Sequence, residues 1–436
     1  MPERARQGSE ARLRDWSWVE ASVWTPRMLE ALGNGVQGGK WFSLIDKVCR
    51  LTTLQAAWEK VRANKGAAGV DGQGVAAFGQ QAPRYLQELH EALKAGSYRP
   101  APLKRVEVPK GPNQTRPLGI PVVKDRVVQT AMKMVIEPIF EAAFLDTSYG
   151  FRPGRGARDA LREVARLLNE GYTHVVDADL QRCFDTIDHD RLRQRVAERI
   201  SDGRVLQILD LWLSQEVVSE LDRWTPESGT PQGAVISPLL ANCFLHPLDA
   251  HLAERGFRMV RYADDFVVLC QSEQQAEAAL LEVRRWVEAN GLLLHPEKTH
   301  VVDALQPGRG FDFLGYHFEA GKRWPRKKSS QKIRDRVREL TRRTRGSGLA
   351  KAIEDLNPVL RGWFGYFKHA RKATFEQLDG FVRRRLRSMM RKFNGQPGRS
   401  ARSTEDHRRW PNTFFAEQGL FTLTAAHAAA IQSRCS

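Results

Sequence analysis

Apolar positions follow two different spacings along the chain. Residues 41–61 and 83–94 carry apolar side chains every three or four positions, which predicts helices. Residues 103–110, 173–180 and 257–270 alternate or are rich in β-branched residues, which predicts short strands. The first three quarters of the chain are therefore predicted to mix helices with short strands.

Two of these patterns place particular side chains. The stretch 257–270 is predicted to form two strands joined at Ala263–Asp265. A helix is predicted over 237–252, with Ser237 as its N-cap, because a short hydroxyl side chain there can accept a hydrogen bond from a free backbone N–H. Asp188 and Asp190 are expected to cap the helix that follows them along the chain for the same reason.

The last quarter of the chain changes to basic, amphipathic helices. Ile333, Val337 and Leu340 form one apolar stripe, and Thr374 with Gln377 has the pattern of a capping box ahead of a second helix. That second helix carries a group of arginines on its predicted outer face: Arg383, Arg384, Arg385 and Arg387. Such a face suits contact with the phosphates of a nucleic acid, and a merely solvated face is the alternative.

Charge is distributed unevenly along the chain. The 436 residues include 68 Lys and Arg against 51 Asp and Glu, for a net charge of +17. Residues 322–400 contain 24 basic and six acidic residues, so this segment accounts for the whole excess. A basic block of this kind indicates a polyanionic partner.

Cysteine usage and hydropathy exclude several classes of protein. The five cysteines are scattered, with no C-x-x-C pair and no accompanying histidine spacing, so neither a zinc site nor a disulfide framework is expected. The first residues are too polar for a secretory signal, and no run of about 18 apolar residues would cross a membrane. We therefore expect a soluble, intracellular protein.

The most informative residues are acidic. Asp264 and Asp265 stand side by side between two apolar strands, where their repulsion makes a bound cation the natural explanation. A divalent metal such as Mg²⁺ takes hard oxygen ligands and is often shared with substrate phosphates. A third ligand is expected from another strand, where Asp177 and Asp179 share one face. Two ions about 4 Å apart can activate a 3′-hydroxyl and stabilise a leaving pyrophosphate.

These residues lie within an ordered set of longer motifs. In chain order the motifs are RPLGIP, DADLQRCFD, GTPQGAVISPLLAN, YADD, GLLLHPEKT and FDFLGY. Together they resemble the reverse transcriptases encoded by group II introns, and the resemblance extends from about Trp41 to Leu423. The segment RGWFGYFKHA also resembles the central helix of that family's thumb.

The resemblance implies an α+β fold of the right-hand polymerase type. Fingers and palm with an antiparallel sheet would be followed by an all-helical thumb, or maturase domain, and a short DNA-binding tail. The implied domains are an N-terminal extension at 1–40, fingers and palm at 41–320, the thumb at 321–400 and the tail at 401–436. The basic block falls where the thumb belongs.

The resemblance also assigns the acidic residues. Asp179 matches the first catalytic aspartate, because it stands five residues before the aromatic Phe184, and Asp177 becomes its neighbour. Asp264 and Asp265 match the second and third catalytic aspartates. The three aspartates would together hold two Mg²⁺ ions.

Nucleotide and primer contacts are implied in the same way. Lys110 and Arg116 match a pair that grips the incoming triphosphate, and arginine suits bidentate contact with phosphate. Phe184 matches the gate that excludes a ribonucleotide 2′-hydroxyl, and Gln232 matches a residue that lines the nucleotide pocket. Two further residues are placed near the primer and the nascent base pair: Tyr262 and Lys298.

The function implied is that of an RNA-directed DNA polymerase that also binds its intron RNA, assists splicing and supports mobility by target-primed reverse transcription. Its partners would be the group II intron RNA, the target DNA, a DNA primer and deoxynucleoside triphosphates, with no membrane and no zinc. We expect it in the cytoplasm of a bacterial cell, associated with the nucleoid. Because no Cys and His cluster follows the thumb, the zinc-containing endonuclease module of some family members is not expected.

Two other functions fit the same motifs. A non-catalytic RNA-binding splicing factor could use this scaffold, but it would not need the three aspartates together with Lys110 and Arg116. A reverse transcriptase recruited to repair or to phage defence would keep the whole polymerase site. Intron RNA structure around the coding region would distinguish this last function from the leading one.

Overall fold

The structure is a computed structural model that describes residues 16–36, 38–111, 114–220, 222–344, 346, 348–395 and 404–435. Parts of the predicted N-terminal extension and tail, and most of the predicted turn after Lys110, lie outside these residues. The described chain forms two compact units. The first contains residues up to 160, 178–268 and 277–299, and the second contains 161–177, 269–276 and the residues from 300 onward. The predicted domain boundaries stay predictions.

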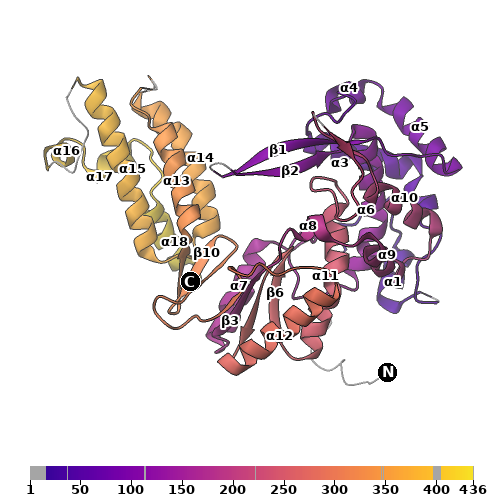
Figure 1. Ribbon diagram of the computed structural model, residues 1–436. Helices are drawn as coiled ribbons and strands as arrows, with labels where there is room; N and C mark the ends of the chain where they lie inside the picture. The colour runs from indigo at the N-terminus through magenta and orange to yellow at the C-terminus, as the bar shows by residue number, and fades with distance from the viewer. Residues whose placement is uncertain are drawn as a thin grey trace. The chain divides into compact units, whose positions relative to one another are not determined.

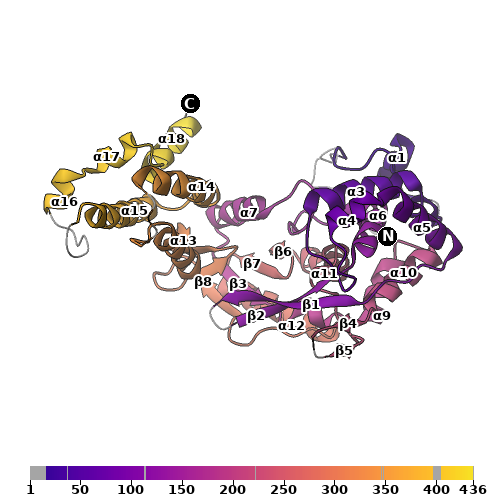
Figure 2. The same cartoon turned by 90° about the horizontal axis from the view of Figure 1, so that it is seen from above.

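Six helices open the described part of the first unit, and α2, α3 and α5 pack against α6 (Figure 2). Their bounds are α1 Pro26–Asn34, α2 Ile45–Val48, α3 Leu51–Asn64, α4 Val75–Gln80, α5 Ala82–Ala95 and α6 Val123–Glu141. Nearly every residue of α6 is buried, and α3 packs along it. The N-terminal segment is attached to this helix, because the buried indole of Trp24 donates a hydrogen bond to the carbonyl of Met134 at 3.1 Å.

A long antiparallel hairpin follows α5 (Figure 1). It belongs to a sheet whose strand order is β2-β1-β4-β5. The strands are β1 Leu103–Gly111, β2 Gln114–Ile120, β4 Val217–Val218 and β5 Arg223–Trp224. The pairing of β1 with β4 is parallel and joins the base of the hairpin to the chain after α10 (Gly203–Leu213).

The predicted aspartate strands belong to a second sheet, with the order β6-β7-β3-β8. The strands are β3 His174–Asp179, β6 Arg258–Tyr262, β7 Asp265–Cys270 and β8 His300–Asp303. β3 and β8 are antiparallel. The two strands predicted within 257–270 are therefore confirmed, and they are separated by only two residues.

Five further helices lie in the described central region of the chain, before and between the strands of this sheet. They are α7 Ala157–Asn169, α8 Cys183–Thr186, α9 His189–Ala197, α11 Ser237–Glu254 and α12 Glu273–Ala289. Asp188 caps α9 as predicted, since its side chain accepts a hydrogen bond from the N–H of Arg191 at 2.8 Å. The same prediction for Asp190 is wrong, because Asp190 lies inside the first turn of α9. The prediction for Ser237 is wrong: Ile236 is the N-cap, and its backbone is already helical, so Ser237 lies inside the first turn.

The second unit combines a small sheet with a group of helices. The sheet has the order β11-β10-β9, with β9 Phe311–Phe313, β10 Tyr316–Glu319 and β11 Lys322–Pro325. The helices are α13 Lys327–Leu340, α14 Leu349–Phe367, α15 Lys372–Phe393, α16 Thr404–Arg409, α17 Asn412–Glu417 and α18 Leu423–Cys435. The predicted stripe of Ile333, Val337 and Leu340 is buried in this unit.

One helix start in the second unit differs from the prediction. The helix α15 begins at Lys372, two residues before the predicted cap Thr374, and its N-cap is Arg371 in an extended conformation. The backbone N–H of Arg371 donates to the carbonyl of Arg323 at 3.1 Å, so the chain is already tied to β11 where the helix starts. This tertiary contact sets the start of the helix in place of the capping box.

Within the described residues, no helix combines the length and the apolar character needed to span a bilayer.

Candidate active site

The paired aspartates lie in a very tight turn. β6 ends at Tyr262 and β7 begins at Asp265, so Ala263 and Asp264 alone form the connection. Ala263 has a φ of +61°, in the left-handed region that a residue with a side chain seldom adopts. Both carboxylates are half-buried at the strand ends. The turn therefore holds two adjacent acids in a fixed backbone conformation.

Asp179 ends the strand next to β7. Its carbonyl accepts a hydrogen bond from the N–H of His295 at 2.8 Å, which attaches the segment GLLLHPEKT to the end of β3. The same segment brings in Lys298, whose Nζ lies 2.7 Å from Oδ2 of Asp179. The structure thus joins two residues that are 119 positions apart and that the sequence had assigned to one site.

Asp264 lies near Cys183, the first residue of α8, four positions after Asp179. Burial raises the pKa of the Cys183 thiol to about 12, and the nearby Asp264 carboxylate contributes to this rise. β3 and β7 are neighbours in the sheet, and the proximity of Asp264 to Cys183 places the aspartate turn at the end of β3 where Asp179 lies. Asp177 lies elsewhere on β3, with its Oδ2 4.0 Å from Nε2 of His300.

Phe184 lies immediately beyond these strand ends, in the short helix α8. Its carbonyl accepts a hydrogen bond from the N–H of Thr230 at 2.6 Å, and its side chain is half-buried. Gly229, with a φ of +90°, permits this approach, because a Cβ there would lie 2.8 Å from the carbonyl oxygens of Phe184 and Asp185. The segment GTPQG therefore needs its first glycine in order to reach α8.

Gln232 is linked to α8 through Asp185, the residue after Phe184. Nε2 of Gln232 donates a hydrogen bond to Oδ1 of Asp185 at 3.0 Å. The backbone carbonyl of Gln232 accepts a hydrogen bond from the N–H of Gly119 in β2 at 2.7 Å, which attaches the hairpin to the same segment. In the sequence Asp185 is the last acid of the motif DADLQRCFD, but nothing there links it to Gln232, which is 47 positions away.

The hairpin carries the two predicted triphosphate ligands. Val108 pairs with Arg116 in the antiparallel register, and the exposed Arg116 precedes Gly119 by three residues on β2. Lys110 lies in β1, but its side chain is outside the described part of the structure. The structure thus brings Arg116 onto the strand that contacts Gln232, and the triphosphate role of both residues stays a prediction.

Tyr262, predicted to lie near the primer, is half-buried and packs against Phe151. The two ring centroids are 6.3 Å apart, and Phe151 is largely exposed with a φ of +58°. The roles of Tyr262 and Lys298 toward the primer stay predictions.

The donor atoms fit a magnesium ion, with one condition. Among the described residues, no three His, Cys, Asp or Glu side chains are gathered closely enough to hold a metal ion by themselves. Mg²⁺ is usually bound by one or two carboxylates that share it with substrate phosphates. Asp179, Asp264 and Asp265 supply such carboxylates at neighbouring strand ends. For Asp179 to bind the ion, the ammonium group of Lys298 must first move away from its carboxylate.

The helix α15 carries the four predicted RNA-binding arginines, and one of them is not on the outer face as predicted. Arg387 is only 2% exposed, because the segment before α17 covers it, and its guanidinium donates to the carbonyl of Trp410 and to Oδ1 of Asn412. It therefore does not lie on an outer face. Arg385 is half-buried and ties α15 to α13, with Nε 3.0 Å from Oγ1 of Thr341.

The other two arginines lie on a basic cavity within the second unit. Arg384 is exposed and Arg383 is half-buried, and both line a cavity of about 460 Å³. Arg334, Arg387 and His407 contribute further basic groups to its wall, against one acidic group from Glu376. Phe381 also lines the cavity, with the guanidinium of Arg384 5.6 Å from its ring centroid. A cavity with several guanidinium groups and an aromatic ring favours an anionic ligand.

Comparison with known families agrees with this arrangement. Residues 108–318 match the family described as reverse transcriptase (RNA-dependent DNA polymerase), and residues 330–410 match the group II intron, maturase-specific domain. The first match covers the aspartates, Phe184 and Gln232, and the second covers α15. The predictions of an RNA-directed DNA polymerase fold and of a maturase domain are thereby confirmed.

Similar proteins point to the same family. The chain is 36% identical to protein YkfC of Escherichia coli, in an alignment that covers 62% of this chain and 82% of YkfC. It is 35% identical to the group II intron-encoded protein LtrA of Lactococcus lactis, over 47% of this chain but only 34% of LtrA. A putative COX1/OXI3 intron 2 protein of Saccharomyces cerevisiae is 30% identical over 46% of this chain and 24% of that protein. The chain therefore belongs to the reverse transcriptases of group II introns, with a polymerase domain followed by a maturase-specific domain.

Proposed function

We propose that this protein extends a DNA primer on an RNA template and that its natural template is the intron RNA that encodes it. One observation carries the proposal: the Asp264–Asp265 turn and Asp179 lie at neighbouring strand ends, next to α8, where Asp185 joins Gln232 to the residue after Phe184. The acids alone would suit many metal enzymes, whereas an aromatic ring and an amide side chain beside them suit a nucleotide.

Each residue has a separate task in the proposed reaction. Asp179, Asp264 and Asp265 would hold the magnesium ions, which when bound supply charge stabilisation for in-line attack of a 3′-hydroxyl on a triphosphate. Arg116 would bind phosphate oxygens, and its planar guanidinium favours bidentate contact. Phe184 would lie against the sugar and exclude a 2′-hydroxyl by steric overlap.

The carboxylate roles can be tested by changing Asp264 to Asn, which keeps the shape of the side chain and removes its charge. Primer extension on an RNA template should fall by at least about 100-fold, because each carboxylate that faces the substrate phosphates supplies part of the metal binding. RNA affinity, measured by filter binding, should not change. Asp190→Asn removes an exposed carboxylate of α9 and should extend primers at the wild-type rate.

Wild-type extension by the Asp264→Asn protein would exclude this residue from the metal site. Loss of extension in both variants would instead indicate a general dependence on surface charge, and the metal assignment would again fail. A melting curve for each variant shows whether the fold is kept.

We further propose that the intron RNA contacts the second unit at the basic cavity. Arg383 and Arg384 would contact RNA phosphates there, and the buried Arg387 would keep the segment before α17 in place through Trp410 and Asn412. Binding through phosphates releases counterions and therefore depends steeply on salt. Splicing assistance would use this surface, and mobility at a DNA target would use both the surface and the polymerase site.

A further inference from the structure

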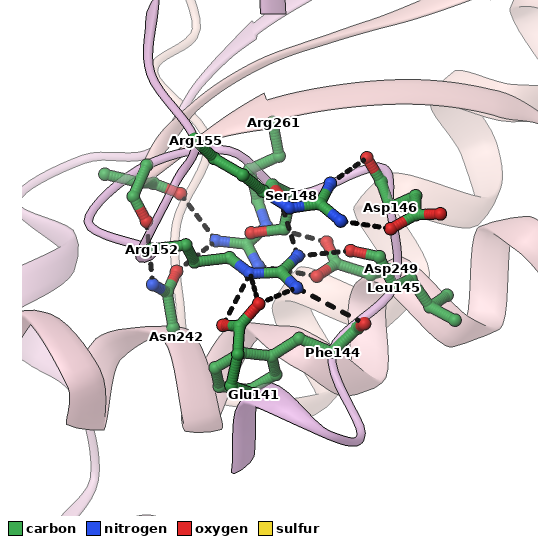
Figure 3. A network of polar contacts seen from close by, with 12 residues as sticks. Glu141, Phe144, Leu145, Asp146, Ser148, Arg152, Arg155, Asn242, Asp249 and Arg261 are labelled. Atoms are coloured by element: carbon green, nitrogen blue, oxygen red, sulfur yellow. Dashed lines mark hydrogen bonds and ion pairs between the residues drawn. The ribbon is translucent and has the colours of Figure 1, made fainter. Parts of the chain in front are cut away.

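Arg261, the residue before Tyr262, is an arginine inside an apolar strand. Its side chain and that of Asp249 in α11 are both 0% exposed, and the two groups form a bidentate ion pair (Figure 3). Nε of Arg261 lies 2.6 Å from Oδ1 of Asp249, and Nη2 lies 2.5 Å from Oδ2. This pair fixes the plane of the guanidinium group.

The remaining nitrogen of this guanidinium points to the aspartate turn. Nη1 of Arg261 donates to the carbonyl of Ala263 at 2.9 Å and to Oδ1 of Asn242 at 2.9 Å. The carbonyl of Ala263 belongs to the peptide group that leads directly into Asp264. Arg261 thus holds the peptide that orients the first aspartate of the pair, although its own side chain points into the core.

Asn242 extends this contact to the other side of the turn. Its Nδ2 donates to the carbonyl of Gly150 at 2.9 Å. A Cβ on Gly150 would lie 2.3 Å from the backbone nitrogen of Ala263, so the two backbones touch at this point. Arg261 also binds this segment through its backbone, by hydrogen bonds with Thr147 and Tyr149 at 2.8 Å. The turn is therefore held from two sides.

Stability alone is a weak reason for a charged pair at this position. Removing two ions from water costs several kcal/mol per ion, and apolar residues of similar size are often equally stabilising. An apolar pair could fill the core, but it could not donate to the Ala263 carbonyl. That carbonyl belongs to a residue with positive φ, a strained conformation that needs support from its surroundings.

We infer that Arg261 is a positioning residue of the polymerase reaction, which fixes the Ala263 peptide and thereby the direction of the Asp264 carboxylate. The inference rests on the proposed role of Asp264. It assigns to the Arg261–Asp249 pair a task that a merely structural ion pair would not have.

The test replaces the pair by an apolar one, Arg261→Met with Asp249→Leu, in the full-length protein. We expect a folded protein in which kcat for primer extension falls about 10- to 100-fold, because a catalytic group displaced by about 1 Å can slow the reaction that much. The KM for the deoxynucleotide should change less than about twofold, since the residues that contact it are intact. Amide hydrogen exchange of the peptide 258–268 should accelerate, which reports on the turn without reference to activity.

A neighbouring ion pair provides the matched control. Arg152 is 1% exposed and binds Glu141 at 2.6 Å, but it contacts the carbonyls of Phe144, Leu145 and Ser148 instead of the turn (Figure 3). Arg152→Met with Glu141→Leu removes a buried pair of the same kind, which holds the segment beside the turn through Ser148 but does not bind the Ala263 carbonyl. Its kcat and its exchange at 258–268 should therefore change less than those of the Arg261 double variant. An equal loss of kcat and an equal gain in exchange in both double variants would overturn the inference.

Arg261→Lys tests the inference independently, and it can be used if the double variant with the apolar pair does not fold. Lysine keeps the charge opposite Asp249 but lacks the planar fork that reaches Asn242 and the Ala263 carbonyl together. The inference requires that this variant be slow and its turn exchange fast; wild-type kcat and exchange would overturn it. If Asp264→Asn also extended primers normally, the proposed function itself would fail, whereas an inactive Asp264→Asn beside a normal Arg261→Lys would remove this inference alone.

Discussion

Gly150→Ala adds one methyl group where two backbone segments touch at the aspartate turn. The new Cβ would lie 2.3 Å from the nitrogen of Ala263 and 2.8 Å from the carbonyl carbon of Tyr262, whereas ordinary van der Waals separation begins at 3.4 Å. Both obstacles are backbone atoms, so no side-chain rotation can relieve the overlap. The two segments must separate by about 1 Å, and a displacement of that size at a catalytic group can reduce the rate about 100-fold.

A 100-fold loss corresponds to about 2.7 kcal/mol of transition-state stabilisation. Steady-state primer extension on an RNA template would measure it, with a melting curve to show that the protein is folded. Gly156→Ala is the control in the same segment, because its Cβ would have no neighbour closer than Oδ2 of Asp159 at 3.9 Å. If Gly150→Ala kept the wild-type kcat, the turn would be free to shift, and the argument that its position is fixed would be refuted.

Two further predictions concern the sugar gate and the basic cavity. Phe184→Ala should raise the ratio of ribonucleotide to deoxynucleotide incorporation, because the ring is proposed to exclude the 2′-hydroxyl sterically; an unchanged ratio would remove Phe184 from the pocket. Arg383→Gln with Arg384→Gln should flatten the slope of log affinity against log salt by about 0.7 to 0.9 for each phosphate that the protein no longer neutralises. Arg62→Gln with Arg84→Gln changes two exposed arginines of the first unit, and a similar flattening there would show that the effect is one of net charge.

Local pattern was enough to predict the parts of the site that depend on one segment. The turn carrying Asp264 and Asp265 follows from two apolar strands that leave only Ala263 and Asp264 between them. The helix N-cap at Asp188 follows from the hydrogen-bonding capacity of its side chain. In both places the residues that determine the structure are close neighbours in sequence.

The sequence prediction missed or misplaced features that depend on contacts between distant segments. Arg387 has the spacing of an outer-face residue, but the chain around Trp410 covers it. Asp185 gains its role only because the segment with Gln232 folds back to α8. Arg261 did carry a signal, since a charged residue within an apolar strand requires a buried partner, but the sequence could not show that the partner is Asp249 on another element.

The ion pair between Lys298 and Asp179 gives one of the proposed metal ligands a counter-charge from the protein itself. In many small metalloproteins metal binding drives folding, because the site does not exist in the unfolded chain. Here a lysine from the same chain serves as the counter-charge of Asp179, at 2.7 Å. If Asp179 binds magnesium as proposed, the ion must take the place of this ammonium group. We therefore expect the fold to form without the ion, and magnesium binding to free Lys298 for contact with a substrate.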